Sequence, residues 1–177
     1  MKPLHFILVL VGFQRLWELV LANRNTKRLK LQGGIERGAR HYPLFFLLHG
    51  SWLMAILLFT PSSRKPDQTL LLLFIALQFA RLWVIRSLGP YWTTRIIILP
   101  VHPVIQNGSY RCFSHPNYII VAGEIALLPL AFGNVTIAFV WSVGNALLLA
   151  LRIHIENAAL AGCDGRQSRT GDYRQSC

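Results

Sequence analysis

The sequence has little charge, and most of the charge that it has is positive. Only 14% of its 177 residues are charged, with 18 Lys or Arg against 7 Asp or Glu, whereas 53% are hydrophobic. A soluble domain of this length carries more charge, so the composition indicates one membrane-embedded domain over residues 1–177. The basic residues lie between apolar blocks and form no stripe with interleaved aromatics. This pattern excludes nucleic acid as the expected partner and favours loops that face anionic membrane lipids.

Cysteine and histidine lack the spacings that are typical of metal sites. The three cysteines, Cys112, Cys163 and Cys177, form no CxxC pair, and the 6 histidines show neither HxxxH nor HExxH spacing. Cys177 is the final residue, so it is no C-a-a-X prenylation site. We therefore expect reduced thiols and no bound metal.

Five apolar stretches have about the length needed to cross the hydrocarbon core of a bilayer. They cover residues 4–22, 43–60, 69–88, 117–132 and 135–151, with polar connections at residues 23–42 and 89–115. Only Gly133 and Asn134 separate the last two stretches, which predicts an antiparallel helical hairpin. The sequence thus predicts an all-α, polytopic membrane protein with about five transmembrane helices and a loose tail over residues 161–177.

Charged residues inside the apolar stretches should be paired. Arg15 and Glu18 are three apart, so they share a helix face and are expected to form an ion pair that points into the bundle. Charges at this position also argue against a cleaved signal peptide. Glu124 is expected to face the interior and to contact a polar group on another helix. For Arg81 and His49 we expect snorkelling or hydrogen bonds between helices, without a chemical role.

The distribution of Lys and Arg among the loops predicts the orientation in the membrane. With five spans, thirteen basic residues fall on the side of the first loop, the loop before residue 116 and the C-terminal end, and three fall on the other side. The positive-inside rule places the richer side in the cytosol. We therefore expect a cytosolic C-terminus and an N-terminus on the opposite side.

Polar residues gather in the stretch YRCFSHPNYIIVAGEIALLPL, residues 110–130. Pro116 fits the first turn of a helix, and Ser114 or His115 can cap that turn. The hairpin brings the start of this helix to the same side as Arg152, which predicts a cytosolic polar pocket near the last hairpin. Arg152 and Glu156 share a helix face, so they either form a stabilising ion pair or bind a ligand.

Several of these segments carry a family resemblance. HPVIQNGSYRCFSHPNY, followed by a membrane hairpin and RIHIE, resembles the isoprenylcysteine carboxyl methyltransferase family, whose members are integral-membrane enzymes dependent on S-adenosylmethionine. RLWELVLANRN and IERGARHYP resemble bacterial members. The resemblance implies that Arg152 contacts the acceptor. It also implies a set of cofactor-binding residues: His102, Pro103, Val104, Ile105, Tyr110, His115, Pro116, Asn117, Tyr118 and Glu156.

The implied reaction is the transfer of a methyl group from S-adenosylmethionine to an oxygen of a lipophilic acceptor. That oxygen belongs to a carboxylate or an acidic hydroxyl, as in a prenylcysteine or an alkylpyrone. The chain departs from the family at Ser114, where an Arg is common, and at Asn157, where a second Glu is usual. Ser114 and the short tail favour an alternative hypothesis, in which the chain is a non-catalytic membrane scaffold or lipid-binding protein that keeps the fold.

Overall fold

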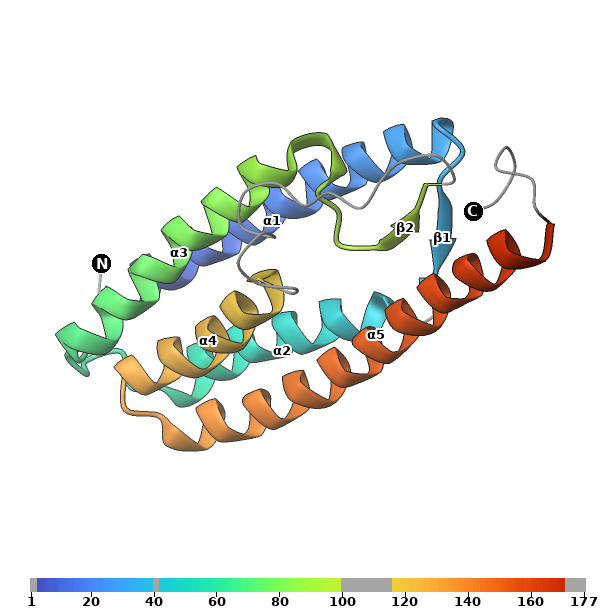
Figure 1. Ribbon diagram of the computed structural model, residues 1–177. Helices are drawn as coiled ribbons and strands as arrows, with labels where there is room; N and C mark the ends of the chain where they lie inside the picture. Colours follow the sequence, from blue (N-terminus) through green and yellow to red (C-terminus); the bar gives the residue numbers. More distant parts are fainter. Residues whose placement is uncertain (1–2, 40–41, 100–115, 171–177) are drawn as a thin grey trace.

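The computed structural model describes residues 3–39, 42–99 and 116–170, except for the side chains of residues 157 and 159–170, and it is almost entirely helical (Figure 1). Among the described residues, the α-helices are α1 (Pro3–Leu31), α2 (Tyr42–Phe59), α3 (Gln68–Leu88), α4 (Pro116–Ala131) and α5 (Val135–Thr170). A short 3-10 helix, η2 (Gly89–Tyr91), follows α3, and two three-residue strands, β1 (Ile35–Arg37) and β2 (Ile96–Ile98), form an antiparallel pair.

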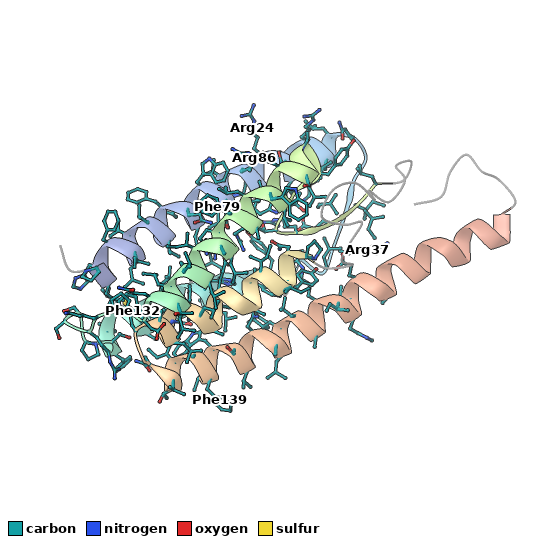
Figure 2. All side chains as sticks on the ribbon, turned by 60° about the vertical axis from the view of Figure 1, so that its left-hand side comes forward. Arg24, Arg37, Phe79, Arg86, Phe132 and Phe139 are labelled. Carbon is teal, nitrogen blue, oxygen red and sulfur yellow. The ribbon has the colours of Figure 1, made fainter. Side chains whose placement is uncertain are left out.

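The helices form a bundle in which α4 packs between α3 and α5, and α2 packs against α5. α1 runs alongside α3 on the far side from α5, as Figure 1 and Figure 2 both show. The strand pair, the C-terminal end of α1 and the second half of α5 lie at the same end of the bundle. The antiparallel hairpin that the sequence predicts is confirmed, because α4 and α5 are joined only by the turn at residues 132–134.

The outside of the bundle is apolar, as expected for a protein in lipid. Phe79 and Phe139 point outward (Figure 2) and leave 69% and 70% of their surface exposed. Within the described residues, four helical segments are long and apolar enough to cross a membrane: Pro3–Leu31, Tyr42–Phe59, Gln68–Tyr91 and Val135–Glu156. α4, with 16 residues, is shorter. The chain therefore has the predicted all-α, polytopic membrane fold.

Pro129 interrupts the hydrogen bonding of α4, and a side chain of α2 repairs it. Proline has no N–H, so the carbonyl of Ile125, four residues earlier, loses its usual helical donor. The indole Nε1 of Trp52 donates to this carbonyl at 3.2 Å. Trp52, Ile125 and Pro129 are all fully buried, so α2 and α4 are held together where α4 would otherwise contain an unpaired buried carbonyl.

Three expectations about the connections are corrected. α1 continues past residue 22 to Leu31, because the segment after residue 22 contains good helix formers and needs no membrane. The helix ends where Gly33 adopts a φ of 88° and the amide of Gly34 donates to the carbonyl of Leu29 at 2.9 Å, which is the Schellman pattern. β1 and β2 pair within segments that the sequence assigns to loops.

The third correction concerns the C-terminal end. α5 continues to Thr170, so the prediction of a loose tail fails for residues 161–170, while residues 171–177 lie outside the described part. Residues 156–161 are mostly Glu, Ala and Leu, which favour helix and allow α5 to run beyond its apolar stretch.

Candidate active site

The first turn of α4 and the middle of α5 bring together the described part of the predicted site. Pro116 opens α4 as predicted and is buried, with Asn117 and Tyr118 following it. Arg152 and Glu156 lie on the facing side of α5. The other predicted cofactor-binding residues, His102, Pro103, Val104, Ile105, Tyr110 and His115, lie outside the described residues.

Tyr118 links Arg152 to Glu156. Arg152 Nε donates to the Tyr118 hydroxyl at 2.9 Å, and the hydroxyl donates to Glu156 Oε2 at 2.7 Å. No salt bridge joins Arg152 directly to Glu156, although the two are four residues apart. The ion-pair interpretation of their spacing is therefore replaced by a three-residue relay that fixes α4 against α5.

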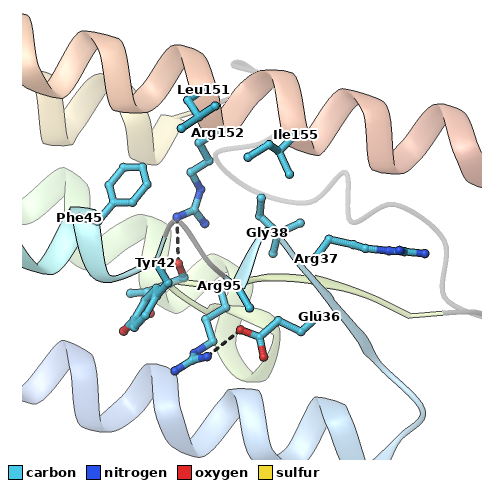
Figure 3. A pocket seen from close by; sticks show the side chains of 12 residues that line it. Glu36, Arg37, Gly38, Tyr42, Phe45, Arg95, Leu151, Arg152 and Ile155 are labelled. Atoms are coloured by element: carbon cyan, nitrogen blue, oxygen red, sulfur yellow. Dashed lines mark hydrogen bonds and ion pairs between the residues drawn. The ribbon is translucent and has the colours of Figure 1, made fainter.

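Two further contacts hold the Arg152 guanidinium (Figure 3). Its Nη1 donates to the carbonyl of Thr94 at 2.9 Å, just before β2, and its Cζ lies 5.5 Å from the centre of the Phe45 ring on α2. Its Nη2 donates to none of the described residues. Three elements thus orient the guanidinium, while the N–H groups of Nη2 are accepted by no residue in the described part of the chain.

The strand pair fixes the Thr94 carbonyl that Arg152 contacts. Glu36 on β1 binds Lys30 of α1 at 2.5 Å and Arg95 at 2.6 Å, and the Arg95 guanidinium lies 4.3 Å from the centre of the Tyr42 ring. Burial raises the pKa of Glu36, but the hydrogen bonds and charges of Lys30 and Arg95 outweigh this effect and hold the pKa below 4.5, its ordinary value. Glu36 is therefore ionised at neutral pH and clamps β1 to the Arg95 side of the site.

A cavity of about 320 Å³ extends from Arg152 and Tyr118 into the bundle. Its walls come from α1, α2, α3, α4 and α5, and most of the lining is apolar. At Gly12 and Gly50, which both line it, an added Cβ would meet nothing within 4 Å. Leu16 of α1 and Phe46 of α2 also line the cavity and leave more than half of their surface exposed. The part of the cavity wall that comes from α1 and α2 is therefore accessible rather than closed by packed side chains.

The inner part of the cavity is bordered by a buried cluster of four charges: Arg15, Glu18, Arg81 and Glu124. Arg81 donates twice to Glu18, from Nε at 2.6 Å and from Nη2 at 2.7 Å, and its Nη1 donates to Glu124 at 3.1 Å. Arg15 binds Glu18 at 2.9 Å and Glu124 at 2.5 Å. Both the predicted Arg15–Glu18 pair and the predicted interhelical contact of Glu124 are confirmed. Arg81 bonds between helices and is buried, so it does not snorkel.

A carboxamide oxygen near the motif also lacks a partner. Asn117 Oδ1 is buried, lines the cavity side of α4, and accepts no hydrogen bond within the described part of the chain. A buried acceptor without a donor costs about 1–3 kcal/mol. Asn117 Oδ1 can therefore accept a hydrogen bond from a ligand in the cavity that carries ammonium or hydroxyl donors.

Sequence reasoning missed Thr94, Tyr42, Phe45 and His49 as parts of the site. Thr94 acts through its backbone carbonyl, so its side-chain type carries no signal. Tyr42, Phe45 and His49 recur at a helical spacing along α2, which places them on one face. That spacing was the available signal, but it is equally typical of an ordinary buried face.

Comparisons with known proteins match most of the chain. The model of the isoprenylcysteine carboxyl methyltransferase family matches residues 70–162. The uncharacterized protein YpbQ of Bacillus subtilis (strain 168) is 32% identical over 158 residues, which cover 87% of this chain and 94% of YpbQ. An uncharacterized protein of Haemophilus influenzae is 28% identical over 155 residues, which cover 83% of this chain and 88% of that protein. No solved structure matches significantly.

Proposed function

Because the chain belongs to the isoprenylcysteine carboxyl methyltransferase family, we propose that it is a membrane O-methyltransferase that uses S-adenosylmethionine. The acceptor is a lipophilic molecule with a carboxylate or an acidic hydroxyl, such as a prenylcysteine or an alkylpyrone. One observation supports this proposal: a single cavity is lined both by the restrained Arg152 guanidinium and by exposed apolar residues of α1 and α2.

Arg152 binds the anionic oxygen of the acceptor. Tyr118 and Thr94 accept hydrogen bonds from Nε and Nη1, so the guanidinium is already fixed before the acceptor binds. Nη2 can then donate to the acceptor with little further loss of side-chain conformational entropy. A carboxylate is already ionised at pH 7, so no base is needed to activate it. The role of Arg152 is then to hold the attacking oxygen in line and to exclude water around it.

The described residues also fit the cofactor. S-adenosylmethionine, when bound, supplies an electrophilic methyl group and presents ammonium and hydroxyl donors. Asn117 Oδ1 and the Glu156 carboxylate accept such donors, and Tyr118 holds Glu156 in place through the 2.7 Å hydrogen bond. We propose the same binding role for His102, Pro103, Val104, Ile105, Tyr110, His115 and Pro116, which the family motif indicates.

The acceptor enters from the bilayer and the cofactor from the cytosol. Gly12 and Gly50 leave open space in the wall between α1 and α2, so we propose that an alkyl or prenyl chain enters there without leaving an apolar medium. The Arg152 end of the cavity lies beside the strand pair and the basic end of α1. We propose that this end faces the cytosol, in accord with the positive-inside distribution.

A methylation assay on isolated membranes tests the proposal. Membranes that contain the protein receive S-adenosylmethionine with a labelled methyl group and a panel of prenylcysteines, alkylpyrones and long-chain acids. We expect a labelled, organic-soluble product with the wild type and a loss of at least ten-fold with Arg152→Ala. Arg86→Ala, which removes a guanidinium at the end of α3 outside the cavity, serves as the matched control.

The scaffold hypothesis predicts a different outcome. A protein that only keeps the fold forms no product from any acceptor and has no reason to bind the cofactor. Calorimetric titration of the detergent-purified protein with S-adenosylmethionine therefore separates the two. Absence of binding, together with absence of product across the panel, contradicts the proposed function.

A further inference from the structure

The inner wall of the cavity is more polar than a purely hydrocarbon chain requires. Arg15, Glu18, Arg81 and His49 all line the same cavity as Tyr118 and Arg152. The four-charge cluster is electrically balanced, with two guanidinium groups against two carboxylates, so its charges alone require no ligand. His49 and the cavity side of Arg15 are different, because both keep unused hydrogen-bonding capacity.

His49 presents an acceptor. Its Nδ1 lies 2.8 Å from the carbonyl of Phe45, and a carbonyl can only accept, so Nδ1 carries the hydrogen. In the neutral ring Nε2 is then an acceptor. No donor for Nε2 is found among the described residues. The ring lies on the face of α2 that lines the cavity, directly before Gly50, which leaves the space beside it open.

Arg15 presents donors at the same depth. Each of its two terminal nitrogens carries two hydrogens and makes one bond, Nη1 to Glu18 and Nη2 to Glu124. Its side chain keeps 13% of its surface exposed, and its positive charge acts on the His49 ring. One small polar group in the cavity can therefore donate to His49 Nε2 and accept from Arg15.

The distance from the methyl-transfer site follows from helix geometry. Tyr42 and His49 are seven residues apart on α2, and Asn117 and Glu124 are seven apart on α4. At 1.5 Å per residue, both intervals correspond to roughly 10 Å along the helix axis. The wall between the two levels is lined by apolar residues, including Val121 and Leu149.

We propose that the acceptor carries a hydroxyl group within its apolar part, roughly 10 Å from the oxygen that is methylated, and that His49 and Arg15 bind this hydroxyl. The inference rests on the proposed function for the role of the ligand as methyl acceptor. His49 is a specificity residue in this scheme. A plain alkyl or prenyl chain would cover its Nε2 and leave the acceptor unpaired, whereas a hydroxylated chain satisfies it.

Binding of matched lipids tests the inference independently of catalysis. The probes are hexadecanoic acid and its monohydroxy derivatives with the hydroxyl on carbon six, eight, ten or twelve. Their dissociation constants are measured on the detergent-purified wild type and on His49→Leu, which removes the acceptor and keeps apolar bulk. Leu58→Met, at an exposed position of the same helix outside the cavity lining, is the matched control. Melting temperatures establish that each variant is folded.

We expect the wild type and Leu58→Met to bind the derivative hydroxylated on carbon eight or ten about ten-fold more tightly than hexadecanoic acid, and His49→Leu to lose this preference. The inference is overturned by equal affinities in the wild type, by a preference that is independent of hydroxyl position, or by a preference that survives in His49→Leu. If His49→Leu does not fold, the position dependence in the wild type decides. Methyl transfer to the same lipids, measured in parallel, reports separately on the proposed function.

Discussion

Replacement of Arg152 by Lys is the sharpest test of the site, because it keeps the positive charge and removes the planar guanidinium with its several N–H donors. The guanidinium donates to the Tyr118 hydroxyl and the Thr94 carbonyl at the same time, and its remaining N–H groups are directed to the acceptor. A single ammonium group at the end of a flexible chain cannot maintain these directions together. At least one charge-assisted hydrogen bond is therefore lost.

The magnitude follows from that loss. A hydrogen bond to a charged group contributes about 1.5–3 kcal/mol, which corresponds to roughly 10- to 150-fold in rate. We expect kcat/KM for the acceptor to fall by this factor in Arg152→Lys, while the dissociation constant of S-adenosylmethionine changes by less than about three-fold, since Glu156 and Asn117 are untouched. Steady-state kinetics against both substrates, with Arg86→Lys as the matched control, measures the effect.

Tyr118→Phe extends the test to the relay. If Arg152 acts through the geometry that Tyr118 imposes, the two substitutions together cost less than the sum of their separate effects. Additive effects would mean that Tyr118 and Arg152 act independently. An Arg152→Lys enzyme with the same kinetics as Arg86→Lys would refute the assignment of Arg152 to the acceptor.

Four other predictions address the rest of the structure. Glu124→Leu leaves two buried guanidinium groups short of a partner, so we expect a loss of about 3–5 kcal/mol in stability, seen as a lower melting temperature and yield; wild-type values would contradict it. Gly12→Leu should raise the acceptor KM at least ten-fold with cofactor affinity unchanged, because its side chain enters open cavity space. Since the pKa of folded Glu36 lies below 4.5, its ion pairs should be intact above that pH and be lost as the pH falls through the lowered pKa. We therefore expect proteolysis near β1 to increase in acid in the wild type and to be independent of pH in Glu36→Gln. A reporter fused after Cys177 should be cytosolic and one at the N-terminus should not, and the opposite labelling would remove the proposed route of the cofactor.

Local spacing made part of this structure predictable. The hairpin follows from a two-residue break between apolar stretches, the start of α4 follows from Pro116, and the Arg15–Glu18 pair follows from a separation of three. The burial of Glu124 follows from the cost of a carboxylate in an apolar helix. The first three features depend on residues that are close in sequence. For Glu124, the free-energy cost of exposing a carboxylate to lipid leaves the interior of the bundle as its location.

The remaining features depend on contacts between distant segments. For Arg81 the sequence leaves snorkelling and hydrogen bonds between helices both open, and the structure decides for the second, because Glu18 and Glu124 come from two other helices and together bind its guanidinium. The link from Arg152 to Glu156 passes through Tyr118, 34 residues away from Arg152. Strand pairing between β1 and β2 joins two three-residue segments that are too short to give a periodic pattern.

The family model covers one part of the cavity wall and not the other, which predicts where acceptor specificity resides. The family model begins at residue 70 and includes Tyr118, Arg152 and Glu156. In contrast, Gly12, Arg15 and the α2 wall of the cavity precede residue 70. The segment that the family model matches therefore contains the relay, the proposed cofactor contacts, and Arg81 and Glu124 of the charge cluster. α1 and α2 contribute Arg15, Glu18 and His49 to the cavity, together with the proposed lipid opening. A change of acceptor is thus expected to follow an exchange of α1 and α2 between relatives, with cofactor binding retained, because the proposed cofactor contacts Asn117, Tyr118 and Glu156 lie on α4 and α5.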